Sequence, residues 1–253
     1  MVWPRTLAKK SLRMEEVKRY DIIQACLDRL KKKKGKVNYV EIGVQTGLCF
    51  FKIKADKKIA VDPNFIIKPT KKIRAYLKNL SNFNNEFFEL TSDAFFAEKS
   101  NYIRAIGGID VIFIDGLHRH DQVVIDIENS LSFLNPGGII LLHDCNPVSE
   151  AAATPGYSPG EIMKNPPKGW TGEWNGDVWK ALVELRSTRS DLDIAVFNCD
   201  YGIGYITEGS PKAMLSYTVD EVGKMDYSDL EKNRTELLNL KEPSELGSYY
   251  NAI

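Results

Sequence analysis

The sequence predicts an α/β protein built on a doubly wound, mostly parallel sheet. Along residues 36–145, short apolar segments alternate with segments of helical periodicity. Strands that are apolar throughout and alternate with helices form parallel sheets that are covered by helices on both faces. Two apolar segments near residue 200 are separated by only about two residues, so they must pair as an antiparallel hairpin. We therefore expect a seven-stranded, Rossmann-like sheet that ends in a C-terminal hairpin.

The elements follow from these patterns. The expected strands are residues 36–41, 58–62, 86–90, 109–115, 138–143, 191–198 and 201–207. The expected helices are residues 14–30, 71–80, 94–105, 122–134, 178–186 and 226–240. Gly35 is expected to end the first helix, whose last turn carries the lysines 31–34.

The chain is expected to be a single domain over residues 1–253. Residues 1–35 form an N-terminal helical extension, residues 36–208 the core, and residues 209–253 a helical tail. Residues 147–174 are rich in Pro, Gly and Ala without a clear period. A loop of this length in a compact domain is usually a binding loop or a lid.

Composition excludes several classes of protein. The 253 residues are 43% hydrophobic and 27% charged, which excludes wholesale disorder. No apolar stretch is long enough to span a bilayer, the N-terminus does not resemble a signal peptide, and the four cysteines form no CxxC pair. We expect a cytoplasmic protein without a membrane partner. Basic residues are concentrated in the first 80 positions, but without the aromatic interleaving typical of RNA-binding modules, so nucleic acid is not expected as a partner.

A cofactor site is expected after the first two strands, because ligands of open parallel sheets bind at the carboxyl ends of the strands. The first strand leads into Glu41, Gly43 and Gly47, and the second ends at Asp62. Glycines allow close approach to a ligand, an acid at Glu41 suits an amino group, and a carboxylate at Asp62 can accept both hydroxyls of a ribose. The combination predicts S-adenosylmethionine. Ser92 and Asp93 follow the third strand and either cap the next helix or reach the adenine amine.

The chemistry is expected after the fourth and fifth strands, which hold all three histidines of the chain. Asp115 and Asp144 each stand where a buried strand emerges, so one site can hold both. Paired carboxylates suit a hard cation such as Mg²⁺. His118 is a candidate general base and His143 a second one, because imidazole titrates near neutral pH. His120 is expected at the surface.

These segments resemble the class I S-adenosylmethionine-dependent methyltransferases, and most of all the branch of macrocin-type and other sugar O-methyltransferases. The resemblance is carried by residues 40–47, 59–63, 113–118, 135–138, 142–147 and 176–180. It implies that Glu41 and Gly43 lie under the methionine part of the cofactor and that Asp62 holds the ribose. It also implies Mg²⁺ on Asp115 and Asp144, with His118 as the base.

The expected activity is methyl transfer to a hydroxyl of a small acceptor, a sugar or glycoside, beneath a lid whose Tyr157, Trp170 and Trp174 can stack on sugar faces. A metal-free reaction with His118 acting alone stays open. A phenol or catechol acceptor also stays open, and so does a cofactor-binding partner subunit without catalysis. A homo-oligomer is possible on sequence grounds.

Overall fold

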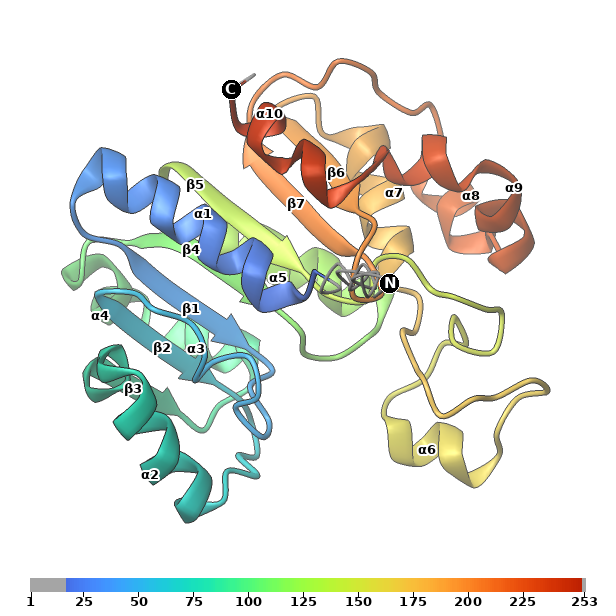
Figure 1. Cartoon of the computed structure of the whole chain (residues 1–253). Helices are drawn as coiled ribbons and strands as arrows, with labels where there is room; N and C mark the ends of the chain where they lie inside the picture. Colours follow the sequence, from blue (N-terminus) through green and yellow to red (C-terminus); the bar gives the residue numbers. More distant parts are fainter. Residues whose placement is uncertain (1–16, 252–253) are drawn as a thin grey trace, which may run out of the picture.

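The computed structural model describes residues 17–251 of the chain, apart from the side chains of Ser248, Tyr250 and Asn251. Its centre is one twisted sheet with helices on both faces (Figure 1). The strands are β1 (Asn38–Ile42), β2 (Lys57–Val61), β3 (Asn85–Phe88), β4 (Ile109–Ile114), β5 (Leu134–Leu142), β6 (Leu192–Phe197), β7 (Ile203–Glu208) and β8 (Leu240–Lys241). The predicted doubly wound, mostly parallel fold is confirmed.

The strand order is β3-β2-β1-β4-β5-β7-β6-β8. Strands β1 to β5 pair in parallel, and β7 runs antiparallel to both of its neighbours. Chain order reverses between β1 and β4, which is where an open sheet of this kind leaves a crevice for ligands. The sheet has one strand more than predicted, because the two-residue β8 pairs beside β6.

The α-helices are α1 (Arg19–Lys34), α2 (Pro69–Lys78), α3 (Ser92–Glu98), α4 (Ser100–Ala105), α5 (His120–Leu131), α6 (Pro159–Lys164), α7 (Val178–Thr188), α8 (Val219–Lys224), α9 (Tyr227–Leu238) and α10 (Leu246–Asn251). Two short 3₁₀ helices, η1 (Leu80–Asn84) and η2 (Pro243–Glu245), complete the described elements. The start predicted for the first helix, residues 14–16, lies outside the described residues. Gly35 ends α1 with φ +80°, as expected.

Three further predictions about elements need correction. The helix expected over 94–105 is two helices, because Lys99 leaves helical geometry with φ −104° and ψ 11°. The loop at 147–174 contains α6, whose N-cap Ser158 accepts a hydrogen bond from the backbone N–H of Glu161. The connection from β6 to β7 is five residues long rather than two, with φ positive at Asp200, Tyr201 and Gly202.

Apolar side chains alternate between the two faces of the sheet and build two cores. On one face Val40, Ile59 and Ile112 contact the cluster formed with α3, α5 and α7. On the other face Tyr39 and Phe113 join the cluster formed with α1 and the segment after β1. Polar side chains are thereby directed to the carboxyl ends of the strands, where the site lies. No helix among residues 17–251 is long and apolar enough to cross a membrane.

Gly43 marks the closest contact between the loop after β1 and the end of β4. Its φ is +83°, and a Cβ there would lie 2.0 Å from the carbonyl oxygen of Asp115. Only glycine can therefore bring this loop against the backbone of Asp115. Gly35 has nearly the same φ, +80°, but open space around its Cα.

We expect Gly43→Ala to destabilise the protein more than Gly35→Ala. A left-handed non-glycine residue costs about 1–2 kcal/mol in both variants. Gly43→Ala loses about 1–3 kcal/mol more, because its methyl group must displace backbone. Urea unfolding measures both. Equal losses would show that the loop yields freely and that the close approach is not a constraint.

Candidate functional site

A cavity of about 750 Å³ lies at the carboxyl ends of the parallel strands. It begins beside β2 and β3, passes the β1–β4 crevice, and reaches the β6–β7 turn and the segment before α7. This volume is in the range of small-molecule and cofactor sites. The strand ends therefore bring most of the predicted site residues to one space.

One end of the cavity holds the residues predicted to bind the cofactor. Asp62 is 7% exposed and lines the cavity, and its carboxylate accepts hydrogen bonds from the backbone N–H groups of Gln45 (2.7 Å) and Asn64 (2.8 Å). These two bonds fix the carboxylate at the cavity wall. Ser92 and Asp93 also line this end. The capping role belongs to Thr91, whose Oγ1 accepts from the backbone N–H of Ala94.

Two predicted cofactor residues lie behind the wall rather than in it. Glu41 is 2% exposed, and its Oε2 accepts a hydrogen bond from the Tyr39 hydroxyl at 2.5 Å. Burial raises the pKa of Glu41 to about 7, although the Tyr39 hydroxyl lowers it. Gly47 contacts the Phe51 ring. Neither residue lines the cavity. Their predicted contacts with the cofactor stay predictions, while Gly43 does line it.

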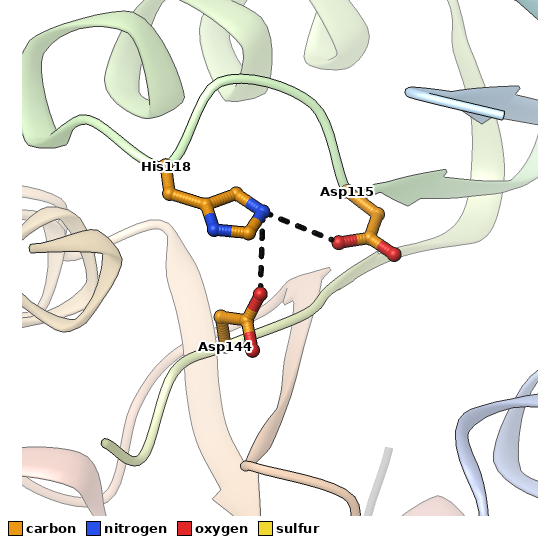
Figure 2. Close-up of side chains that lie close together, drawn as sticks. All are labelled: Asp115, His118 and Asp144. Carbon is orange, nitrogen blue, oxygen red and sulfur yellow. Dashed lines mark ion pairs between the residues drawn. The ribbon is translucent and has the colours of Figure 1, made fainter. Parts of the chain in front are cut away.

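The other end of the cavity gathers Asp115, His118 and Asp144 (Figure 2). One ligand atom from each lies within 4.8 Å of the other two. Asp115 follows β4, and Asp144 follows β5 in a left-handed conformation with φ +61°, an uncommon one for a non-glycine residue. The His118 Nε2 atom lies 3.2 Å from Asp144 Oδ2 and 3.5 Å from Asp115 Oδ1. The predicted juxtaposition of the two carboxylates is thus present.

The orientation of His118 is set by the segment before α7. Its Nδ1 lies 3.1 Å from the carbonyl oxygen of Trp174, which can only accept, so Nδ1 carries the proton. In the neutral ring the lone pair is therefore on Nε2, facing both carboxylates. The Trp174 ring stacks on His118 with centroids 4.9 Å apart. Burial lowers the pKa of His118, but Asp115 and Asp144 outweigh it and raise the pKa above 6.5.

His143 is the most enclosed histidine, at 5% exposure. Its Nε2 lies 2.8 Å from the carbonyl oxygen of Asp200, and its Nδ1 lies 2.9 Å from Asp144 Oδ2 and 3.2 Å from Asp115 Oδ1. The contacts of Nδ1 with the two carboxylates are ion pairs, but they lack the geometry of a hydrogen bond. Burial opposes the charged form, yet the two carboxylates raise the pKa of His143 to about 10. His143 is accordingly a buried cation at neutral pH, which suits charge balance better than proton abstraction.

Arg19 and Asp200 belong to the site, although the sequence did not indicate them. Arg19, in the first turn of α1, donates from NH1 to Asp115 Oδ2 and from Nε to Asp200 Oδ2, both at 2.7 Å. The left-handed turn after β6 presents Asp200. Burial would raise the pKa of Asp115, but His143, His118 and Arg19 together hold that pKa well below its usual range. No local motif signals these contacts, because they join distant segments.

The end of the predicted lid closes over the acidic centre. Asn175 is 2% exposed and donates from Nδ2 to Asp144 Oδ1 at 2.5 Å. Gly176 packs so tightly that a Cβ would lie 2.0 Å from the His118 carbonyl oxygen. Of the three aromatic residues predicted to face an acceptor, Trp174 lines the cavity, whereas Tyr157 is 65% exposed and lies beside the Arg119 guanidinium. His120, expected at the surface, is half-buried and pairs with Glu184.

The donor set fits a divalent cation. Asp115, His118 and Asp144 offer two carboxylates and one imidazole lone pair toward a common point, with the His118 ring held by a carbonyl. Mg²⁺ prefers an all-oxygen shell, and an imidazole nitrogen is a more usual ligand for transition metals. Coordination by His118 Nε2 would occupy the atom that a general base needs. The predicted metal and the predicted base therefore compete for one nitrogen.

The comparisons with known proteins identify the core. Residues 40–145 match a family described as a methyltransferase domain. This part of the chain is a methyltransferase domain. It holds β1 to β5, and with them Asp62, Asp115, His118 and Asp144. The resemblance to methyltransferases found in the sequence, and the enzyme class it implied, are thereby confirmed, whereas the sugar O-methyltransferase branch stays a prediction. No curated protein matches the chain.

Several solved structures resemble this chain. An O-methyltransferase from Bacillus cereus, in complex with SAH, is 16% identical, with 78% of this chain and 84% of that one covered at a TM-score of 0.47. The O-methyltransferase TomG from Streptomyces achromogenes, in complex with SAM, is 13% identical, with coverages of 73% and 78% and a TM-score of 0.47. An O-methyltransferase of Klebsiella pneumoniae, described as putative, is 14% identical, with coverages of 78% and 83% and a TM-score of 0.46.

We expect Arg19→Gln to lower the free energy of unfolding by about 1–3 kcal/mol, since it removes the guanidinium that donates to both Asp115 and Asp200. The control is Lys31→Gln on the same helix. Its ion pair with Asp56 is also 2.7 Å long, but the lysine side chain is 48% exposed against 24% for Arg19. The control should lose less than about 1 kcal/mol. Urea unfolding of both variants measures the difference, and a loss at Arg19 no greater than at Lys31 would contradict its role.

Proposed function

We propose that the protein is an S-adenosylmethionine-dependent O-methyltransferase that acts on a hydroxyl group of a small sugar or glycoside. The supporting observation is a single cavity with Asp62 at one end and the Asp115–His118–Asp144 centre at the other. With the methyl donor at the Asp62 end and the hydroxyl acceptor at the Asp115–His118–Asp144 end, the methyl group and the acceptor oxygen would meet between the two ends. Alignment of the reacting atoms is the main protein contribution to such a displacement.

The cofactor would be held by the end of the cavity nearest β2 and β3. Asp62 would accept from the ribose hydroxyls, since its carboxylate is already fixed by two backbone N–H groups. Ser92 and Asp93 would face the adenine, together with Gln122 of α5, which donates to Asp93 and Asp126. Gly43 would allow the methionine part to approach the backbone. When bound, S-adenosylmethionine supplies a methyl group on a sulfonium.

His118 would remove the acceptor proton. The hydroxyl oxygen forms a bond to the methyl carbon while the carbon–sulfur bond breaks, and the hydroxyl proton passes to His118 Nε2. Nδ1 is held by the Trp174 carbonyl, so Nε2 is the atom free to accept. Asp115 and Asp144 stabilise the imidazolium that forms. His143 and Arg19 limit the repulsion between the two carboxylates.

A divalent cation would be held by Asp115 and Asp144. Bound there, it acts as a Lewis acid on acceptor hydroxyls. His118 either joins it as a ligand or serves as the base. We assign the base role to His118, because its Nε2 is free to accept a proton, whereas the raised pKa of His143 keeps that ring protonated. The hydroxyl-rich acceptor fits the polar groups at this end, among them Glu173 and Tyr201, and the Trp174 ring.

We expect Asp62→Ala to weaken binding of S-adenosylhomocysteine by about 10–100-fold, since hydrogen bonds to a charged group contribute about 1.5–3 kcal/mol. Calorimetric titration measures the affinity. Asp191→Ala is a matched control, because Asp191 is an exposed acid that pairs with the nearby Arg189 and does not line the cavity. Wild-type affinity in Asp62→Ala would refute the ribose assignment.

We expect His118→Ala to lower turnover by about 10²–10⁴-fold while cofactor affinity stays unchanged, the usual span for a proton-transfer group. The base must be neutral, so wild-type activity falls as pH decreases through the pKa of His118. Because that pKa is raised above 6.5, the fall should begin above pH 6.5. Methyl transfer to a panel of sugars, glycosides and catechols, measured across pH, tests this.

The same assay with EDTA or added Mg²⁺ and Mn²⁺ separates the two roles of the centre. A cation that binds Asp115 and Asp144 competes with the proton on His118 and shifts the acid limb to lower pH. His120→Ala is the control histidine, since His120 pairs with Glu184. Near-full turnover with an unchanged acid limb in His118→Ala would place the base elsewhere. Cofactor binding without turnover on any acceptor would instead favour a non-catalytic partner subunit.

A further inference from the structure

An exposed apolar patch lies in residues 66–83, the segment that includes α2 and η1 and precedes the edge strand β3. Its members are Ile66 (54% exposed), Ile73 (62%), Leu77 (76%), Leu80 (77%) and Phe83 (68%). Five of the twelve large hydrophobic side chains exposed among the described residues thus fall within 18 positions. Single exposed hydrophobic residues are ordinary, but a contiguous group marks an interaction surface.

The largest aliphatic side chains of α2 face outward, whereas those of a helix that packs on a core face inward. Ala75 and Tyr76 are half-buried and face the core, and no residue of α2 is fully buried. Ile73 and Leu77 are four positions apart, so they lie on one face of the helix, which is the outward face. Packing among residues 17–251 therefore does not account for these two side chains.

Within this segment of the sequence the charge has one sign. From residue 63 to residue 85 there is no Asp or Glu, whereas Lys68, Lys71, Lys72, Arg74 and Lys78 are basic. Lys68, Arg74 and Lys78 are exposed. Lys71 and Lys72 are partly committed, to the Thr46 carbonyl and to the Phe87 ring respectively. The occupant of the patch must therefore accept apolar side chains and carry negative charge.

We propose that this surface, residues 66–83, docks the protein on an anionic phospholipid membrane. A helix with Leu, Ile and Phe on its exposed face and Lys or Arg along its flank is the pattern of helices that lie in the membrane interface. Anionic headgroups supply the complementary charge. The sequence predicted no membrane partner because no segment can span a bilayer, but a peripheral contact needs no spanning segment.

A second copy of the chain fits the patch less well. In a symmetric dimer the same patch meets itself, so the five basic residues of one chain would face those of the other without an acid among residues 63–85. The patch also borders the catalytic cavity, because Ile66 belongs to both. Docking there would place the cofactor end of the cavity next to the headgroups.

The test is co-sedimentation of the full chain with two kinds of vesicle, one of phosphatidylcholine alone and one of phosphatidylcholine and phosphatidylglycerol in equal parts. We expect binding to the anionic vesicles only, and weaker binding at about 0.5 M salt than at about 0.05 M, where screening is less. Arg74→Gln with Lys78→Gln should lower the partition coefficient by about 25-fold, or about 5-fold per basic residue.

Paired substitutions inside and outside the patch test whether vesicle binding depends on residues 66–83. Ile73→Ser with Leu77→Ser should abolish binding, whereas Val148→Ser with Val219→Ser, which changes two exposed apolar residues elsewhere, should not. Lys164→Gln with Lys224→Gln is the charge control. Cofactor affinity and thermal unfolding establish that each variant is folded. The proposal is overturned if wild type binds neither vesicle, if the control pairs lose binding equally, or if light scattering shows a dimer that Ile73→Ser with Leu77→Ser dissociates.

Discussion

Two carboxylates at the ends of neighbouring buried strands impose the constraint on which the site depends. Strands β4 and β5 pair in parallel with Ile114 opposite Leu142, so the sheet brings the Asp115 and Asp144 carboxylates that follow them within 4.8 Å of one another. Like charges this close and this enclosed are costly unless positive charge compensates them. His143, His118 and Arg19 all contact Asp115, and the two histidines also contact Asp144. The arrangement of the whole carboxyl edge follows from this balance.

Each compensating group comes from a different part of the fold. Arg19 begins α1, His118 lies in the loop before α5, and His143 directly precedes Asp144. Carbonyl oxygens of Trp174 and Asp200 then fix the two imidazole rings. Helix packing is therefore coupled to the orientation of the side chains at this centre. A shift of α1 or of the β6–β7 turn would alter both the compensation of the Asp115 charge and the cavity wall, because Arg19 and Tyr201 line the cavity.

The sequence was sufficient for the parts of the site that depend on strand ends. Asp62, Asp115 and Asp144 were predictable because a polar residue that ends an apolar strand must emerge at the ligand edge. Arg19 and Asp200 were not, since their contacts join residues 96 and 181 positions away from Arg19 and depend on a left-handed turn after β6. The same rule does not hold for Glu41. Its side chain points to the face of the sheet that α1 covers, where the Tyr39 hydroxyl donates to it behind the cavity wall.

The contact between Arg19 and Asp200 also has a consequence for folding during synthesis. A ribosome completes α1 and the first five strands before Asp200 exists, since chains emerge N-terminus first at about 5–20 residues per second. Until the β6–β7 hairpin is made, Asp115 and Asp144 have His143 beside them but lack the turn whose carbonyl holds that ring. The acidic centre is thus completed only after the β6–β7 turn is made, by a pairing that spans 181 positions. Closure of this ring of contacts couples α1, the earliest described helix, to the antiparallel hairpin, so the acidic centre is complete only after β7 has joined the sheet.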